Sequence, residues 1–284
     1  MSIIVTGASG QLGRLVIDQL LATVPASEVT AVVRDPGKAS GLAARGVTLA
    51  VADYNSPESF DGLLQAGDRV LLISGSEMHR DRAAQHQAVL GAAAKAGVAL
   101  FAYTSIIGSQ TGPVTDDHRA TEDAIRASGV PYSLLRNNLY HEMVTMNIPA
   151  ALQHGALVRA AGDGRVASAA RADYAAAAAA VLSGDGHEDT VYELSGDTAW
   201  SFAEFAAELS KQSGRQVPYR AVTGEEYAAI LSAAGLPDPI PHVLAGFDAS
   251  ITAGELAVTT GDLSRLAGRP TTRVADAIAA ALAG

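Results

Sequence analysis

The fold is decided by Ser2-Ile3-Ile4-Val5-Thr6-Gly7-Ala8-Ser9-Gly10-Gln11-Leu12-Gly13. A short apolar run leads directly into three glycines spaced three residues apart, and a helical pattern begins at Gln11. A strand, a glycine-rich turn and a helix in this order are typical of the phosphate-binding loop of a Rossmann sheet. Gly7 permits the tight turn, Gly10 lets the backbone approach a pyrophosphate, and Gly13 lets the helix pack closely. The N-terminus of the helix then offers free N–H groups and a positive dipole to phosphates.

The remaining first half alternates apolar runs with helical segments. The pattern predicts strands over residues 2–6, 29–33, 47–51, 69–73, 100–105 and 132–136, and helices over 11–23, 37–45, 57–65, 81–96 and 117–128. Nearly continuous apolar strands separated by helices predict an α/β fold, a Rossmann-type doubly wound parallel sheet. A strand near 191–194 completes the sheet, so we expect the Rossmann domain to cover residues 1–195.

A smaller, α-rich C-terminal lobe is expected over residues 196–284, covering the substrate. Ser201 and Glu204 form a capping-box pattern that predicts a helix to about residue 212. Further helices are predicted over 225–234 and 273–282, with a proline-rich turn over 237–241. Residues 138–150 are expected to contribute to the substrate pocket, and the alanine-rich run 175–182 reads as a buried core helix.

Composition narrows the range of functions. The 284-residue chain has a formal net charge of -10, which disfavours binding to nucleic acid. It has no cysteine, so disulfides, thiolate metal sites and cysteine nucleophiles are excluded, and we expect no metal. Without a signal-peptide pattern or an apolar stretch of ~20 residues, we expect a cytoplasmic protein that does not enter the membrane. Homodimer formation is left open.

The end of the second predicted strand indicates which cofactor binds. NAD sites favour an acidic residue there, whereas NADP sites favour a positive one that pairs with the additional phosphate. Here the strand ends at Arg34, and Lys38 adds a second positive charge. An acidic residue at Asp35 would favour NAD if it contacted the ribose. We expect Asp35 instead to cap the helix that begins near Gly37, so the positive charges of Arg34 and Lys38 favour NADPH.

Polar residues also follow the third and fourth strands. Asp53 and Tyr54 are candidates to border the adenine, and Ser74, Gly75 and Ser76 to border the ribose and nicotinamide. Ordinary loop positions are the alternative for each.

The Tyr-x-x-x-Lys pair, which supplies a proton in common short-chain dehydrogenases, is absent. Tyr132 and Arg136 share its spacing but fall on a strand. His118 lies on the expected helix, where we favour a solvated residue over an acid.

The motifs as a set resemble the NmrA-like group of atypical short-chain dehydrogenases. The resemblance rests on the glycine loop and on Val33-Arg34-Asp35-Pro36, Ala102-Tyr103-Thr104-Ser105, Leu135-Arg136-Asn137, Ala160-Ala161-Gly162-Asp163-Gly164, Arg171-Ala172-Asp173-Tyr174 and Val191-Tyr192-Glu193-Leu194. Within the group it points to type 2 quinone oxidoreductases and, almost as strongly, to triphenylmethane dye reductases. It implies an NADPH-binding Rossmann domain and hydride transfer to a flat conjugated acceptor.

The resemblance also implies particular cofactor contacts. These are the glycine loop, Arg34, residues 74–76 and residues 137–142, which include Asn137, Asn138, Leu139 and Tyr140; Thr104 and Ser105 are further candidates. The chain has Gly75 and Asn138 where the resemblance leads us to expect serine and glycine.

A quinone or a cationic dye already accepts hydride well, so alignment and exclusion of water supply most of the catalysis. Asn138 and Tyr140 are the candidate catalytic donors to a developing oxyanion, against structural roles for both. Met143, Met146 and Phe247 form either an apolar wall for the acceptor or ordinary core packing. The functions that remain open are a quinone reductase, a dye or other conjugated-acceptor reductase, and a regulator that senses NADP without turnover.

Overall fold

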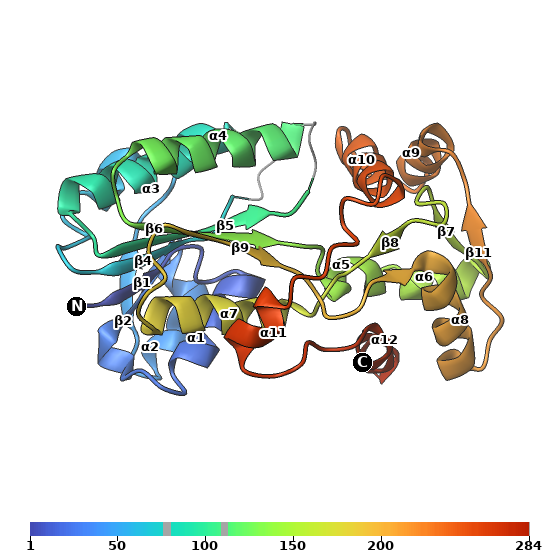
Figure 1. The fold of residues 1–284 in the computed structure, drawn as a ribbon, viewed down its shortest axis with the longest axis horizontal. Coiled ribbons are helices and arrows are strands. Elements are labelled where there is room, and N and C mark those ends of the chain that lie inside the picture. The colour runs from blue at the N-terminus through green and yellow to red at the C-terminus, as the bar shows by residue number, and fades with distance from the viewer. Residues whose placement is uncertain (76–80, 109–112, 284) are drawn as a thin grey trace. The chain divides into compact units, whose positions relative to one another are not determined.

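The computed structural model describes residues 1–75, 81–108 and 113–283. The chain divides into two compact units, coloured by residue number in Figure 1. Unit 1 comprises Met1–Ile106, Pro113–Asn137 and Tyr174–Glu193, and unit 2 comprises Ile107–Gly112, Asn138–Asp173 and Leu194–Gly284. Unit 2 thus contains residues 138–173, which we had placed in the Rossmann domain, because this segment packs into the core of the C-terminal part.

Unit 1 is built on a parallel sheet, which confirms the predicted fold class. In the described part of the chain the sheet has seven strands, in the order β3-β2-β1-β4-β5-β6-β9. The strands are β1 (Ile3–Val5), β2 (Val29–Val33), β3 (Thr48–Val51), β4 (Arg69–Leu72), β5 (Leu100–Ile106), β6 (Tyr132–Asn137) and β9 (Thr190–Leu194). β1 pairs with both β2 and β4, so the order reverses between β1 and β4.

Helices cover both faces of this sheet, as a doubly wound fold requires. Figure 1 shows α3 (Arg82–Ala96) and α4 (Pro113–Ala127) on one face, and α1 (Gln11–Leu20), α2 (Ser40–Ala43) and α7 (Arg171–Ser183) on the other. Ala177, Ala178 and Val181 of α7 are buried, so the alanine-rich run is a core helix.

Two predicted helices are wrong in extent. Residues 57–65 form only the 3-10 turn η3 (Pro57–Phe60), because Asp61 is extended and Gly62 adopts a φ of 73°. Residues 37–45 form η2 (Pro36–Ala39) followed by the short α2.

Unit 2 is rich in helices with short strand pairs. Its elements are α5 (His141–Thr145), α6 (Ile148–His154), β7 (Leu157–Arg159), β8 (Arg165–Val166), β10 (Trp200–Ser201), α8 (Phe202–Ser213), β11 (Tyr219–Ala221), α9 (Gly224–Ala233), α10 (Ile240–Thr252), α11 (Asp262–Ala267) and α12 (Val274–Ala283). The predicted capping box of Ser201 and Glu204 opens α8. The proline-rich segment was predicted only as a turn, but it leads into α10 with Pro241 in its first turn.

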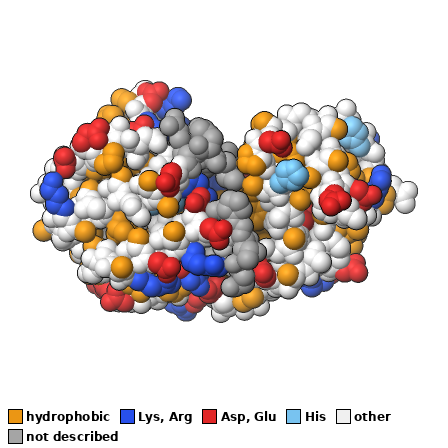
Figure 2. Space-filling model, turned by 90° about the horizontal axis from the view of Figure 1, so that it is seen from above, with side chains coloured by type: hydrophobic (Ala, Val, Ile, Leu, Met, Phe, Trp, Pro, Cys, Tyr) orange, Lys and Arg blue, Asp and Glu red, His pale blue; other side chains and the backbone are white. Residues whose placement is uncertain are grey.

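The surface carries charges of both signs. On the face drawn in Figure 2, acidic and basic side chains are interspersed among uncharged ones. Among the described helices, none is long and apolar enough to cross a membrane. The described residues also hold no group of three or more side chains arranged to bind a metal.

Candidate dinucleotide site

The candidate site lies in unit 1, where the strand order reverses. The carboxyl ends of β1 and β4 are neighbours there, and in open parallel sheets this switch point is where ligands bind. Thr6 joins the two ends, because its hydroxyl donates to the carbonyl oxygen of Leu71 (3.0 Å) and accepts from the N–H of Ile73 (3.1 Å). The loops after β1 and β4 therefore start from one hydrogen-bonded point.

The glycine-rich loop has the geometry that the sequence predicts. Gly7 has a φ of 60°, which is unfavourable for any side chain. A Cβ on Gly13 would lie 2.5 Å from the carbonyl oxygen of Gly7 and 2.7 Å from the Cα of Ala8, so only glycine permits this close approach. Gly10 is the N-cap of α1 and provides no side-chain cap. The first-turn amides of α1 are thus available for an anion. The glycine-rich loop and these amides together form a glycine cradle (residues 7–13) that fits a pyrophosphate.

A missed residue, Arg14, ties this loop to the next one. Its Nε donates to the carbonyl oxygen of Ser9 and its Nη2 to that of Lys38, both at 2.9 Å. A basic side chain in the first turn of a helix opposes the helix dipole, and that mismatch was the signal available in the sequence.

The loop after β2 presents positive charge. Arg34 and Lys38 are exposed. Asp35 is the N-cap of η2, where its carboxylate accepts from the N–H of Gly37 at 2.9 Å, as predicted. Because this carboxylate is already engaged in a cap, the pattern at 34–38 remains that of a site for the additional phosphate of NADP.

Tyr54 and Asp53 are held by neighbouring protein groups. The Tyr54 hydroxyl lies 2.5 Å from Thr6 Oγ1 and donates to the carbonyl oxygen of Ile73 at 2.9 Å. Burial raises the pKa of Tyr54, although Thr6 and the charge of Arg34 oppose the shift. The Asp53 carboxylate accepts from the backbone N–H and Nδ2 of Asn55, both at 3.0 Å. Tyr54 therefore links the segment after β3 to Thr6 and Ile73 at the switch point, and its predicted contact with adenine stays a prediction.

Residues 74 and 75, which follow β4, are held through their backbone. The N–H of Ser74 donates to Thr104 Oγ1 at 2.9 Å. The N–H of Gly75 donates to His86 Nε2 at 3.0 Å, and its carbonyl oxygen accepts from Arg82 Nε at 2.7 Å. Ser76 lies outside the described residues. The sequence did not single out Arg82 or His86, because neither follows a strand.

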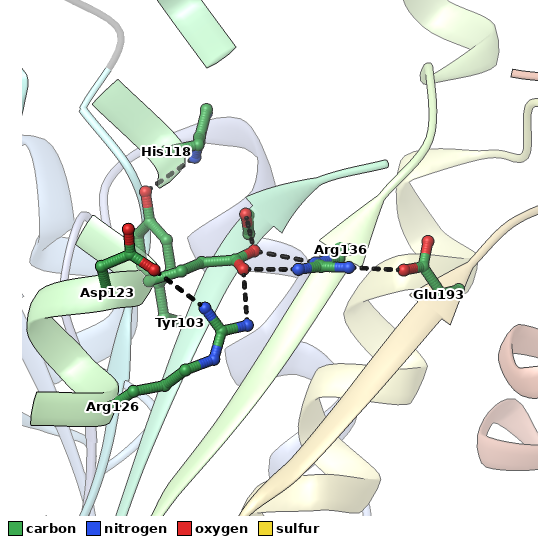
Figure 3. A network of polar contacts seen from close by, with 8 residues as sticks. Tyr103, His118, Asp123, Arg126, Arg136 and Glu193 are labelled. Atoms are coloured by element: carbon green, nitrogen blue, oxygen red, sulfur yellow. Dashed lines mark hydrogen bonds and ion pairs between the residues drawn. The ribbon is translucent and has the colours of Figure 1, made fainter. Parts of the chain in front are cut away.

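Ser105 and Arg136 belong to a network around Glu122, drawn in Figure 3. Glu122 accepts from Ser105 (2.6 Å), from Arg126 (2.9 Å) and from both Nε and Nη2 of Arg136 (2.9 and 2.6 Å). Arg136 also bonds Glu193 of β9. Burial alone would raise the pKa of Glu122, but the bonds from Arg136 and Ser105 lower it. This network fastens α4 to β5, β6 and β9.

His118 is not the solvated helix residue that we expected. It is 4% exposed, and its ring nitrogens lie 2.7 Å from the Tyr103 hydroxyl and 3.0 Å from Arg82 Nη2. Burial and the charge of Arg82 lower the pKa of His118 to about 3. The expectation was wrong because α4 turns this position toward α3 and β5.

The two candidate catalytic residues lie in unit 2. Asn138 is buried, its Nδ2 donates to the carbonyl oxygen of Leu256 (3.0 Å), and its Oδ1 accepts from the N–H of Leu139 (2.7 Å). The guanidinium of Arg171 stacks 4.6 Å from the ring centroid of Tyr140. Met143 and Phe247 pack against the core of unit 2, as in the alternative kept for them, whereas Met146 is 73% exposed.

A glycine-rich loop at the switch point of a doubly wound sheet defines a dinucleotide-binding protein of the Rossmann class. The model of the NAD(P)H-binding family matches residues 7–185, and the chain belongs to this family. It is 48% identical to quinone oxidoreductase 2 of Escherichia coli K12 over 278 residues, which are 97% of each chain.

Solved structures agree. The NADPH-dependent quinone oxidoreductase of Escherichia coli, complexed with NADPH, matches with a TM-score of 0.94 and 48% identity over 98% of this chain and 99% of that one. Triphenylmethane reductase of a Citrobacter species, complexed with NADP(H), matches with a TM-score of 0.93 and 40% identity over 99% and 100%. The resemblance inferred from the motifs is confirmed.

Proposed function

We propose that the chain is an NADPH-dependent oxidoreductase that transfers hydride to a quinone. The observation that carries this proposal is the glycine cradle at the switch point, with Arg34 and Lys38 at the end of β2. It is supported by 48% identity, over nearly the whole chain, to a quinone oxidoreductase.

Different loops of unit 1 would bind different parts of NADPH. The amides of the loop 7–13 would hold the pyrophosphate, and Arg34 with Lys38 the 2′-phosphate. The loop 74–75 would lie beside the nicotinamide half, because it follows β4 across the switch point. When bound, NADPH supplies the hydride.

The acceptor side is proposed for unit 2. The guanidinium of Arg171 stacks on the ring of Tyr140, and we assign to this phenol the hydrogen bond to the oxygen of a quinone as negative charge develops. Asn138 has one amide N–H engaged by Leu256 and a second one that can donate. After hydride transfer the reduced quinone needs one proton, which water can supply, so no buried acid is required. The proposals of a substrate-covering C-terminal lobe, a cytoplasmic location and a homodimer stand beside this one.

A dye reductase is the second candidate, favoured by the 40% identity to the Citrobacter triphenylmethane reductase. The test is to follow NADPH oxidation with benzoquinone and, separately, with a cationic triphenylmethane dye. We expect faster turnover with the quinone. Turnover of the dye alone would reassign the acceptor. Tight NADPH binding without turnover of either would identify a redox-sensing regulator.

A further inference from the structure

A cluster of buried polar side chains in unit 1 has no part in the reaction proposed above. Arg82 and His86 of α3, Tyr103 of β5 and His118 of α4 are each 4% exposed or less. Buried polar groups are costly unless they are hydrogen-bonded, so a connected cluster of this size calls for an explanation.

The cluster ends on the backbone of one residue, Gly75. His86 accepts the N–H of Gly75 at 3.0 Å, and Arg82 donates to its carbonyl oxygen at 2.7 Å. Two buried side chains thus hydrogen-bond both backbone polar groups of this residue. A Cβ on Gly75 would lie 2.8 Å from Gln85 Oε1, so the end of that side chain would have to move to admit it.

The hydrogen bonds around the two histidines have one consistent direction. His86 Nε2 accepts from Gly75, so its proton is on Nδ1 and is donated to Thr121 Oγ1 at 2.8 Å. Thr121 in turn donates to the carbonyl oxygen of Asp117 at 2.8 Å. His118 Nε2 accepts from Arg82 at 3.0 Å, so its Nδ1–H is donated to Tyr103 at 2.7 Å.

Both histidines must therefore be neutral, since a second proton would oppose Gly75 N–H in one and Arg82 in the other. Burial and the charge of Arg82 lower the pKa of each histidine to about 3, so both rings are neutral at pH 7, as the hydrogen bonds require.

We propose that Arg82 and His86 are positioning residues of the cofactor site, which hold Gly75 and so fix residues 74–75 beside the nicotinamide half of NADPH. This rests on the proposed function, because it takes residues 74–75 as part of that site. His118 and Thr121 act one step further back: His118 orients Arg82, and Thr121 fixes the tautomer of His86.

The test compares His86→Leu with His86→Gln, measuring the NADPH dissociation constant by calorimetry without an acceptor. Leucine removes the acceptor for Gly75, whereas Oε1 of glutamine replaces Nε2 at a similar reach. We expect NADPH to bind roughly 10-fold more weakly to His86→Leu and within about three-fold of the parent to His86→Gln, the difference expected for one hydrogen bond. The KM for NADPH should follow, while the KM for quinone stays unchanged.

Ser133→Ala is the matched control. Ser133 is a fully buried residue near the amino end of β6, the end away from the candidate site. Its hydroxyl donates to the carbonyl oxygen of His187 at 2.5 Å. This variant should lower the melting temperature without changing NADPH affinity. If His86→Leu does not fold, the nearly isosteric Thr121→Val replaces it, with an expected loss of about three-fold that Thr121→Ser restores.

An NADPH affinity for His86→Leu, or for its replacement Thr121→Val, equal to that of Ser133→Ala would overturn the proposal. So would equal losses for His86→Leu and His86→Gln. Failure of the proposed function looks different, because a parent that binds NADPH without reducing quinones leaves the comparison of dissociation constants intact.

Discussion

At the scale of single residues, Gly10 and Gly13 separate binding from folding. A Cβ on Gly10 would meet only the Gly7 carbonyl oxygen, at 3.1 Å, whereas one on Gly13 would overlap backbone at 2.5 Å. Gly10→Val should therefore keep the parent's melting temperature within a few degrees and abolish NADPH binding, because the side chain fills the space for the pyrophosphate. Gly13→Ala should lose both affinity and about 2–3 kcal/mol of stability. Calorimetry and thermal denaturation measure the two effects, and undiminished NADPH binding by Gly10→Val would place the phosphates elsewhere.

Arg34 should determine the choice of cofactor. Arg34→Glu removes a charge-assisted contact and adds repulsion, so we expect NADPH binding to weaken by roughly 2–3 kcal/mol and NADH binding to change little. Titrations of both cofactors provide the measurement, with Lys38→Ala as a milder comparison. Equal losses for NADPH and NADH would contradict the assignment of the 2′-phosphate to this loop.

Tyr140 offers a cleaner test of the acceptor side than Asn138. Tyr140→Phe keeps the ring against Arg171 and removes only the hydroxyl, so turnover with quinone should slow by about 10-fold to 100-fold with NADPH binding unchanged. Asn138→Ala should slow turnover similarly but also lower stability, because it breaks the bond to Leu256. Steady-state rates with melting curves distinguish these effects. Unaltered turnover in Tyr140→Phe would remove the tyrosine from the reaction.

At the scale of elements, the pairing of α3 with α4 should make stability depend on pH. In the unfolded chain His86 and His118 bind protons below about pH 6.5, whereas in the fold their pKa values are about 3. The unfolded state therefore binds more protons between these values, and the free energy of unfolding falls as the pH falls, by up to ~1.4 kcal/mol per pH unit for each histidine. The charged and titratable groups that face the two rings belong to α3, β5 and α4. They are Arg82, Tyr103, Asp117 and Glu122, and the hydroxyl of Thr121 lies beside them.

Urea unfolding at pH 7, 6 and 5 would measure this slope. His118→Gln should reduce it, since glutamine does not titrate. A slope identical to the parent's would show that other groups govern the acid sensitivity.

Elements were predictable from the sequence where the local signals agreed. β2 was predicted at its observed bounds, and the capping box of α8 is present, because apolar runs and caps act over a few neighbouring residues. The predicted helix over 57–65 was wrong because the backbone becomes extended at Asp61 and Gly62 then adopts a positive φ, so the 3-10 turn ends at Phe60. α10 was missed because its prolines indicate a turn, yet Pro239 is the N-cap of a helix and Pro241 lies in its first turn.

The candidate site was predictable only in part, for the same reason. The glycine loop and the Asp35 cap are local, and both were found. Arg82 and His86 reach Gly75 only after α3 folds back onto β4, and no spacing in the sequence signals that contact.

At the scale of the whole molecule, unit 2 has its own buried ion pair. Arg159 and Asp248 bond each other through two guanidinium nitrogens, and Asp248 also accepts from the N–H of Ala160 at 2.8 Å. Phe202 and Tyr227 lie beside the guanidinium, with ring centroids at 4.5 and 5.4 Å. Asp248→Asn would leave a buried cation without its counter-charge.

We expect Asp248→Asn to cost about 3–5 kcal/mol of unfolding free energy, the usual effect of breaking a buried pair. Chemical denaturation measures the loss, and Glu204→Gln, at an exposed pair with Arg165, serves as a control with a cost below about 1 kcal/mol. Equal costs for the two variants would mean that the buried pair is dispensable.

The two hydrogen bonds from Arg14 couple the loop at 34–38, which is proposed to select NADPH, to the glycine-rich loop. Lys38 contributes its carbonyl oxygen to the same guanidinium that steadies Ser9. If an NAD-type loop replaced residues 34–38, the backbone carbonyl oxygen at position 38 would no longer accept the hydrogen bond from Arg14, unless the new loop had the same backbone conformation there. A redesign for NADH should therefore weaken the grip on the pyrophosphate shared by both coenzymes, and its substitutions should be epistatic with position 14. Libraries that diversify residue 14 together with the loop are the route by which laboratory evolution would change the coenzyme.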